Sequence, residues 1–491
     1  MKNSKTNIMN MVSNKVLTVF IAAAIMMGSC DDFGNINTDP NNPSVAKTEL
    51  LFTNAQTSVS DVVGAFTGTL YVQYFAETQY NEDSRYQTPS FDYTGWYTGP
   101  LKDLNTIIDL NSDPATADDV LTGGSNANQI AAARIMKVYF FQMIADRWGV
   151  VPYTEALQGS ENFRPAFDSQ ETIYTDLISE LSSATDQIGN GTGVTGDIFF
   201  GGDMNEWKKF ANSLRMRLAL RLADVAPSAA KSAFEDAYSD GMITNDIFYP
   251  YLNESANQNP WFERFITRTD YGISATIADT MKALQDRRVL AFADPAQNAD
   301  NADGTTQFNE VIGLEYGASE PGDIPNATIS FPGQAVRAQD APLPIITLAE
   351  LHLALAEAAQ RGWSVGGTAE SHYVAGIQAS WNQWGMTDVA NQTAYVNQPG
   401  VSYDANNWEA LIGFQKWVAL FPNGYEGWSE WRRLDYPALE VHPDAFNSLT
   451  EIPTSHGYPT SAATLNEENY NAAVSTRGGD GLSVKLWWDA N

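Results

Sequence analysis

Residues 347–361 read TLAELHLALAEAAQR and form the clearest helical segment of the chain. Thr347 and Glu350 have the spacing of a capping box, in which hydroxyl and carboxylate satisfy backbone N–H groups that the first helical turn leaves free. Gly362 follows as a typical helix stop. One apolar stripe recurs at helical spacing and consists of Leu348, Leu351, Leu355 and Ala358. The segment therefore predicts an amphipathic helix with one buried face.

Similar apolar periodicity recurs along most of the chain. It predicts helices over residues 50–80, 126–148, 172–188, 204–224, 273–290, 368–384 and 406–421. Pairs of alanine-rich amphipathic helices are typical of stacked tetratricopeptide-like units, although no strict repeat of about 34 residues is present. Strand signals are few, and long connections lie at residues 89–100, 189–202, 248–260, 294–344 and 440–491. We expect a mainly α fold with tetratricopeptide-like helix pairs and long elaborated loops.

The composition limits the class of partner. The chain has 59 Asp and Glu against 28 Lys and Arg, a formal net charge of −31. This balance repels nucleic acid and anionic lipid headgroups, so neither is expected as a partner. The acidic residues are scattered, which is typical of a solvated surface, and 43% hydrophobic residues are ample for a packed core.

The N-terminal residues have the pattern of a bacterial lipoprotein signal. Three lysines precede an apolar stretch at residues 16–27 (VLTVFIAAAIMM), and Gly28 and Ser29 come directly before Cys30, the single cysteine. Such a cysteine accepts a diacylglycerol after cleavage, so lipid chains such as palmitate would hold the protein on a membrane. We therefore expect a signal peptide at residues 1–29, a flexible tether at 30–44 and a single domain at 45–491. The alternative is an ordinary secreted protein with an incidental cysteine.

Motifs of common enzymes are absent from the sequence. The four histidines (His352, His372, His442 and His456) have no paired metal-ligand spacing, and no nucleophile elbow, phosphate loop or dinucleotide motif is present. Paired carboxylates of a glycoside hydrolase stay open as an alternative, because many acidic pairs exist and none stands out. We predict no catalytic step and no cofactor.

One loop has oxygen ligands that could suit calcium. Residues 294–304 (DPAQNADNADG) contain Asp294, Asp300 and Asp303 beside a glycine, but they lack the EF-hand spacing and its closing glutamate. A solvated loop is the favoured interpretation, and a structural calcium ion is the alternative.

Aromatic residues beside polar ones provide the clearest chemical signal. Such rings cover the C–H face of a sugar while amides, carboxylates and arginines bind its hydroxyls. The mixture is concentrated at residues 77–97 and 257–271. We select as candidate ligand-binding residues Tyr80, Asn81, Asp83, Arg85, Tyr86, Trp96, Tyr97, Asn259, Trp261 and Arg268. By contrast, the tryptophans at 408, 417, 428 and 431 lie in helical patterns and are predicted to be core.

Several longer runs resemble a known family. They are residues 146–156 (DRWGVVPYTEA), 344–347 (PIIT) with Glu350, 356–362 (AEAAQRG), 415–417 (QKW), 424–437 (GYEGWSEWRRLDYP) and 485–489 (KLWWD). These runs are spread along the whole chain. Through them the chain resembles the SusD/RagB family of nutrient-binding outer-membrane lipoproteins of Bacteroidota, in particular its SusD-like branch.

The resemblance implies both a place and a partner. It implies a lipid-anchored protein on the outer face of the outer membrane that captures oligosaccharides and delivers them to a SusC-like TonB-dependent transporter. Asp31 and Asp32 fit the acidic residues that this phylum uses for surface export. The glycan is not identified, although a neutral β-glucan suits an acidic chain better than a polyuronate. A peptide-binding member of the same family is the main alternative.

Overall fold

The helix predicted from residues 347–361 is present as α15 (Leu348–Gln360) in the computed structural model, which describes residues 46–299 and 307–490. The Thr347 hydroxyl accepts a hydrogen bond from the Glu350 N–H group at 3.2 Å, as predicted for the N-cap. The Glu350 carboxylate, however, accepts hydrogen bonds from the Arg217 side chain. The predicted capping box is therefore only half formed, because this carboxylate joins a buried ion pair instead.

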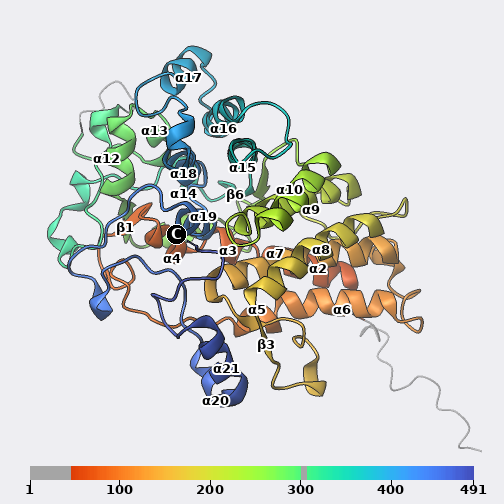
Figure 1. The fold of residues 1–491 in the computed structure, drawn as a ribbon. Coiled ribbons are helices and arrows are strands. Elements are labelled where there is room, and N and C mark those ends of the chain that lie inside the picture. The colour runs from red at the N-terminus through yellow and green to blue at the C-terminus, as the bar shows by residue number, and fades with distance from the viewer. Residues whose placement is uncertain (1–45, 300–306, 491) are drawn as a thin grey trace, which may run out of the picture. The chain divides into compact units, whose positions relative to one another are not determined.

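Most of the longer helices pack against their neighbours in the chain (Figure 1). One series consists of α6 (Pro100–Ser112), α7 (Asn126–Trp148), α8 (Gln170–Gln187), α9 (Met204–Arg221) and α10 (Pro227–Asp240). A second series consists of α15, α16 (Ala369–Gln383), α18 (Trp408–Ala419) and α19 (Gly424–Leu434). Helix α15 also contacts α9 and so joins the two series. The mainly α fold with paired helices is thus confirmed.

Shorter elements complete the fold. The helices are α2 (Thr48–Thr57), α3 (Ser60–Val63), α4 (Phe66–Tyr71), α5 (Thr94–Thr98), α11 (Pro260–Phe265), α12 (Ala275–Ala283), α13 (Val289–Phe292), α14 (Gln334–Arg337), α17 (Val389–Val396), α20 (Thr460–Leu465) and α21 (Glu467–Arg477). Three antiparallel two-stranded sheets pair β1 (Phe75–Glu77) with β5 (Tyr271–Ile273), β2 (Val151–Pro152) with β3 (Phe167–Asp168), and β4 (Ile247–Tyr249) with β6 (Leu343–Ile346). Residues Thr48–Asn491 form one compact unit.

Two predicted helices are interrupted. The expected helix at residues 50–80 is divided into α2, α3 and α4 and then ends in strand β1. The residue after α3 is Gly64, where a Cβ atom would lie 2.3 Å from the Pro260 ring, so a side chain does not fit there. Strand β1 forms because Phe75 and Ala76 pair with β5. The expected helix at residues 273–290 begins as strand β5 and continues as α12 and α13. Tertiary pairing thus overrides local periodicity in both segments.

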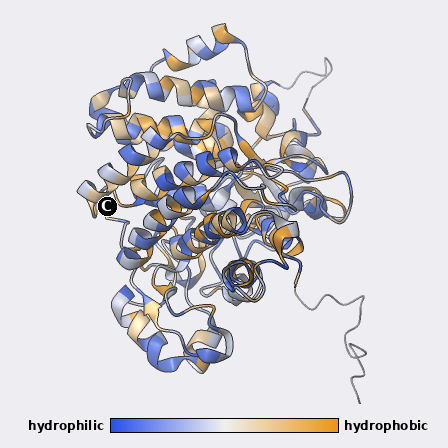
Figure 2. Ribbon diagram, turned by 90° about the vertical axis from the view of Figure 1, so that its right-hand side faces the viewer, coloured by the Kyte–Doolittle hydropathy of each residue, from blue (hydrophilic) through white to orange (hydrophobic). Residues whose placement is uncertain are grey.

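The helices bury mixed faces rather than simple apolar stripes. In Figure 2 polar and apolar residues alternate along most helices. Helix α7 is buried almost all round because α6, α8 and α9 pack against it. Fully buried aromatic side chains fill the interior, among them Trp148, Trp207, Trp261, Trp417, Trp428 and Trp488. Trp417 and Trp428 are therefore core as predicted, whereas Trp408 and Trp431 are half-buried.

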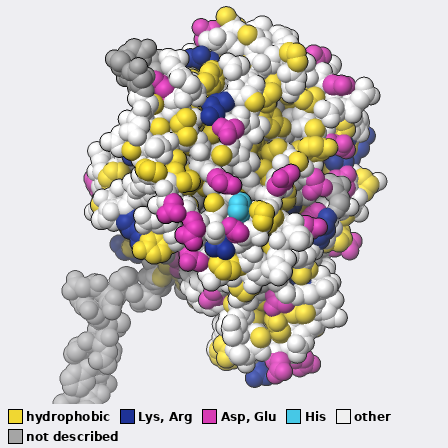
Figure 3. All heavy atoms as spheres, turned by 90° about the vertical axis from the view of Figure 1, so that its left-hand side faces the viewer, with side chains coloured by type: hydrophobic (Ala, Val, Ile, Leu, Met, Phe, Trp, Pro, Cys, Tyr) yellow, Lys and Arg dark blue, Asp and Glu magenta, His cyan; other side chains and the backbone are white. Residues whose placement is uncertain are grey.

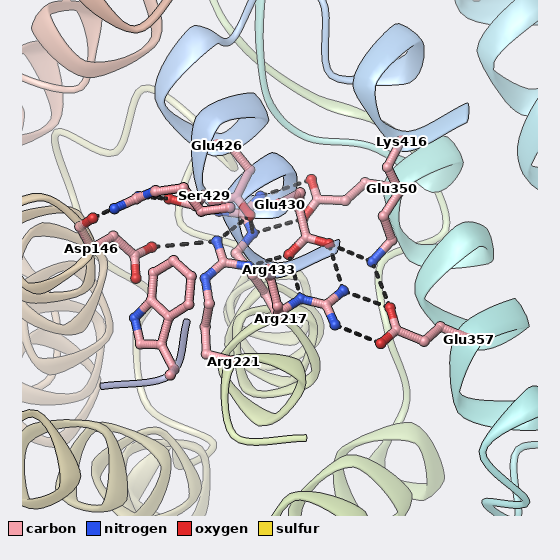
Figure 4. A network of polar contacts seen from close by, with 12 residues as sticks. Asp146, Arg217, Arg221, Glu350, Glu357, Lys416, Glu426, Ser429, Glu430 and Arg433 are labelled. Atoms are coloured by element: carbon pink, nitrogen blue, oxygen red, sulfur yellow. Dashed lines mark hydrogen bonds and ion pairs between the residues drawn. The ribbon is translucent and has the colours of Figure 1, made fainter. Parts of the chain in front are cut away.

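A network of buried ion pairs lies where α7, α9, α15, α18 and α19 meet (Figure 4). Arg217 binds Glu350, with 2.6 Å between Nε and Oε1, and Arg221 binds Glu426, with 2.6 Å between Nη2 and Oε1. Lys416 lies 2.6 Å from Glu430. The side chains of Arg217 and Arg221 are both buried, at 4% and 0% exposure. Buried charges need such partners because an unpaired charge loses its hydration.

No helix among the described residues is both long enough and apolar enough to cross a membrane. The predicted signal at residues 1–29, Cys30 and the tether at residues 30–44 lie outside the described part of the chain.

Candidate functional site

The β1–β5 sheet brings two of the predicted binding loops together. Glu77 at the end of β1 pairs with Tyr271 at the start of β5, so the loops at residues 78–87 and 266–270 leave the same end of the sheet. The Thr78 hydroxyl donates to the Thr269 carbonyl oxygen at 2.7 Å and holds the loops in place. The pairing therefore places Tyr80 next to Arg268.

Tyr80 and Arg268 form an exposed stacked pair. The Tyr80 side chain is 67% exposed, and the Arg268 guanidinium lies 4.5 Å from the centroid of its ring. Arg268 is itself positioned by Asp270, with 2.7 Å between Nε and Oδ2. Tyr80 has a φ of +53°, a left-handed conformation that costs energy for a tyrosine and directs the chain sharply at this point. The pair offers one aromatic ring face to solvent beside fixed hydrogen-bond donors.

A buried carboxyl group supports the loop at residues 78–87 from below. The Glu77 carboxylate accepts a hydrogen bond from the Ser84 N–H group at 2.8 Å. Burial raises the pKa of Glu77 to about 8, although the bond from Ser84 opposes this shift. Burial also raises the pKa of Asp83, and the neighbouring Glu82 adds to this effect.

Two further loops from distant parts of the chain complete the surface. Arg85 donates from Nε to the Asp444 carbonyl oxygen at 2.8 Å, and its guanidinium lies 4.2 Å from the Phe446 ring centroid. Asn81 donates to the Ala318 carbonyl oxygen. Asn326 donates from Nδ2 to the Thr269 hydroxyl at 2.7 Å. We call the surface formed by residues 78–87, 266–270, 315–326 and 440–447 the Tyr80 surface.

Five of the ten predicted ligand-binding residues lie on this surface: Tyr80, Asn81, Asp83, Arg85 and Arg268. Trp96 and Tyr97 lie elsewhere, on α5, where their rings pack against Phe140 and Phe141 of α7. The Tyr97 hydroxyl donates to the Pro152 carbonyl oxygen at 2.6 Å. These two half-buried rings therefore belong to a different part of the protein.

Four of the ten predicted residues are buried, namely Asn81, Tyr86, Asn259 and Trp261. Direct ligand contact is a wrong prediction for the last three, whose side chains are almost completely enclosed. Trp261 has no exposed surface, because its ring packs 4.6 Å from Phe75 and 5.6 Å from Tyr271. Asn259 caps α11 through Oδ1 and donates from Nδ2 to the Ala341 carbonyl oxygen at 2.6 Å. Tyr86 is 1% exposed. All three support the structure from inside, and Trp261 packs directly under the β1–β5 sheet.

Sequence reasoning missed the polar residues that the two distant loops contribute. His442 lies 3.5 Å from Glu315, and Asp444 accepts a hydrogen bond from the Ser319 N–H group at 3.2 Å. These loops contain no aromatic cluster, and their only signal was their length without regular structure.

The face of the protein that includes α12 and the loop after it is predominantly acidic. Figure 3 shows more Asp and Glu than Lys and Arg on this side, with apolar side chains between them. Near Tyr80 the acidic groups are Glu82, Asp83 and Asp270, and the basic ones are Arg85 and Arg268. An acidic surface disfavours anionic ligands such as polyuronates.

The predicted calcium loop is only partly described. Asp294 lies 2.6 Å from Arg337, which uses this carboxylate in an ion pair. Asp300 and Asp303 lie outside the described residues. Within residues 46–299 and 307–490, no group of three or more histidine, cysteine, aspartate or glutamate residues is placed to hold a metal ion.

Comparisons with known proteins define the class. The SusD-like family described as "Starch-binding associating with outer membrane" (SusD-like_2) matches residues 40–459. The chain belongs to this family.

Solved structures of SusD homologues have the same fold. A chitin-binding protein is similar with a TM-score of 0.76 and 27% identity, over 91% of this chain and all of that one. A chitin-binding SusD homologue from Flavobacterium johnsoniae gives 0.74 and 24% identity, over 90% and 99%. A SusD homologue from Bacteroides fragilis NCTC 9343 gives 0.78 and 22%, over 90% and 100%. Among curated proteins, none matches the sequence of this chain.

Proposed function

We propose that the protein is a non-catalytic, lipid-anchored glycan-binding protein of the outer-membrane surface, which captures oligosaccharides at the Tyr80 surface and delivers them to a SusC-like TonB-dependent transporter. The observation that carries this proposal is the exposed Tyr80 ring, covered on one side by Arg268 and followed in the same loop by the partly exposed Asp83. An open ring face beside carboxylate and guanidinium groups is a combination that binds a sugar ring.

The charge of this surface narrows the glycan class to uncharged polymers. Glu82, Asp83 and Asp270 would repel the carboxylates of a polyuronate. The family description names starch, and two similar structures are named as chitin-binding. Starch, chitin and neutral β-glucans are therefore the polymers to test.

Affinity electrophoresis and calorimetry with soluble starch, glycol chitin and a β-1,3-glucan test the proposal. Tyr80→Ala and Arg268→Ala should each weaken binding of the preferred polymer by about tenfold, since stacking contributes about 1 kcal/mol or more. Phe163→Ala is the matched control, because Phe163 is 79% exposed and distant in sequence from the Tyr80 surface. Equal binding by Tyr80→Ala and by the control would refute the assignment of the surface.

Anchoring and delivery are tested separately from binding. Cys30→Ala should leave glycan binding by the protein unchanged but release it from the outer membrane, and growth on the bound polymer should fail. Growth at the normal rate in this variant would contradict the role of the anchor in delivery.

A further inference from the structure

A large polar cavity lies over α7, between α6 and α8, and the loop at residues 153–161 forms its fourth wall. Its volume is about 880 Å³, which is within the range of ligand-binding pockets. Each helix contributes residues spaced one turn apart, such as Lys102, Asn105 and Asp109 on α6. The walls therefore come from secondary structure on three sides and from a loop on one.

One wall has a preformed chain of donors and acceptors. Lys137 donates from Nζ to the Asn105 Oδ1 atom at 3.1 Å, and Asn105 donates from Nδ2 to Asp109 at 2.9 Å. An ammonium group has three N–H donors, and within the described residues Lys137 uses one of them in a hydrogen bond. Burial lowers the pKa of Lys137, while Glu180 and Asp109 favour its charged form. Oxygen atoms of a ligand could accept hydrogen bonds from the other N–H groups of the Lys137 ammonium.

The opposite wall is held by a tyrosine. The Tyr153 hydroxyl donates to Asp176 at 2.5 Å, and its ring packs edge-on against Phe141 with 4.8 Å between centroids. Both side chains line the cavity, so its apolar floor and its acceptor carboxylate are fixed in advance. Glu180 is similarly fixed by two hydrogen bonds from Arg134.

The charges decide which ligand fits. The cavity is lined by two lysines (102 and 137) and four acidic residues (109, 161, 176 and 180), so an anion would be repelled. A ligand with many hydroxyl groups can accept from the ammonium groups and donate to the carboxylates at once. We infer that this cavity is a second saccharide-binding site, for the end of an uncharged oligosaccharide, formed by α6, α7, α8 and residues 153–161.

This site is separate from the Tyr80 surface. Figure 1 shows α6, α7 and α8 on one side of the molecule and β1 and α12 on the other. The two sites share no residue. The inference therefore goes beyond the function proposed for the Tyr80 surface, and the two can fail independently.

Calorimetry with chitotetraose, cellotetraose, laminaritetraose and maltotetraose tests the inference. Lys137→Met keeps the aliphatic stem but removes the donors, and Lys231→Met on α10 is the matched control at an exposed lysine. At least one of these sugars should still bind the Tyr80→Ala variant. The double variant Tyr80→Ala, Lys137→Met should bind the same sugar about tenfold or more weakly than Tyr80→Ala alone. The control should bind as the Tyr80→Ala variant does.

Hydrogen exchange locates the effect. The bound sugar should slow amide exchange at residues 153–161 in the Tyr80→Ala variant, independently of any change at residues 78–87. The inference is overturned if no tetrasaccharide binds the Tyr80→Ala variant, or if Lys137→Met leaves binding and protection unchanged. It is also overturned if a trilysine peptide competes for the cavity and binds Lys137→Met more tightly, since the cavity would then select cations.

Discussion

The Arg433 guanidinium and the Glu357 carboxylate lie face to face in the interior, with two hydrogen bonds of 2.5 Å between them. Arg433 is on α19 and Glu357 is on α15, so the pair joins two helices of the second series. Lys416 of α18 also lies 3.2 Å from Glu357. The tight pairing of these helices thus depends on charge as well as on apolar contact (Figure 4).

Removal of one partner of this pair should be costly. We expect Arg433→Met to lower the free energy of unfolding by about 3 kcal/mol, because the buried carboxylates of Glu357 and Glu430 each lose a hydrogen-bonded cation. Among the described residues, Glu357 then keeps only Lys416 and Arg361 as ion-pair partners. Denaturant unfolding measures the loss. Arg134→Met, which breaks the half-exposed pair with Glu180, is the control and should cost about 1 kcal/mol or less. Similar losses in the two variants would show that the buried pair contributes no more than a surface one.

The same carboxylate makes stability fall in acid. Burial disfavours the charged form of Glu357, but Arg433 and Lys416 outweigh this and hold its pKa at about 2. Because the folded pKa is lower than the unfolded value of about 4.5, the stabilisation is complete above that value and is lost as pH falls toward 2. Thermal unfolding between pH 6 and pH 2 should show this loss. A flat profile below pH 4.5 would contradict it.

Glu77 should have the opposite effect. Its folded pKa of about 8 lies above the unfolded value of about 4.5, so its contribution to stability is present below pH 4.5 and is lost as pH rises to 8. Glu77→Gln keeps the acceptor for the Ser84 N–H group and removes the titration. Urea unfolding from pH 5 to pH 9 should therefore decline less in the variant than in the wild type, and parallel curves would refute the shift.

Substitution of Tyr80 should affect glycan binding, whereas substitution of Trp261 should affect the stability of the fold. Tyr80→Ala should reduce glycan binding and leave the unfolding midpoint nearly unchanged, because its ring is largely exposed. Trp261→Ala should lower the free energy of unfolding by about 3–5 kcal/mol, because it leaves a cavity under the β1–β5 sheet. Calorimetry and denaturant unfolding of both variants distinguish the two roles. A large stability loss for Tyr80→Ala would place its ring in the core.

The sequence predicted the helices better than the site. Capping at Thr347 predicted the bounds of α15, and the periodicity of residues 126–148 predicted those of α7, both to within one or two residues. Composition also selected Tyr80 and Arg268, but it could not distinguish them from Trp261, because an aromatic beside polar residues looks the same whether its loop is exposed or packed. Burial of Trp261 follows from the pairing of β1 with β5, which joins residues almost 200 positions apart.

The contact between Arg85 and Asp444 spans 359 positions of the chain. A protein that emerges N-terminus first presents Tyr80 and Arg268 long before Asp444 and Phe446 are available to support them. The Tyr80 surface is therefore complete only when nearly the entire chain has been synthesised and folded. The glycan binding that we propose for the Tyr80 surface would therefore begin only after the C-terminal loops have docked, so the order of synthesis sets when this site becomes competent.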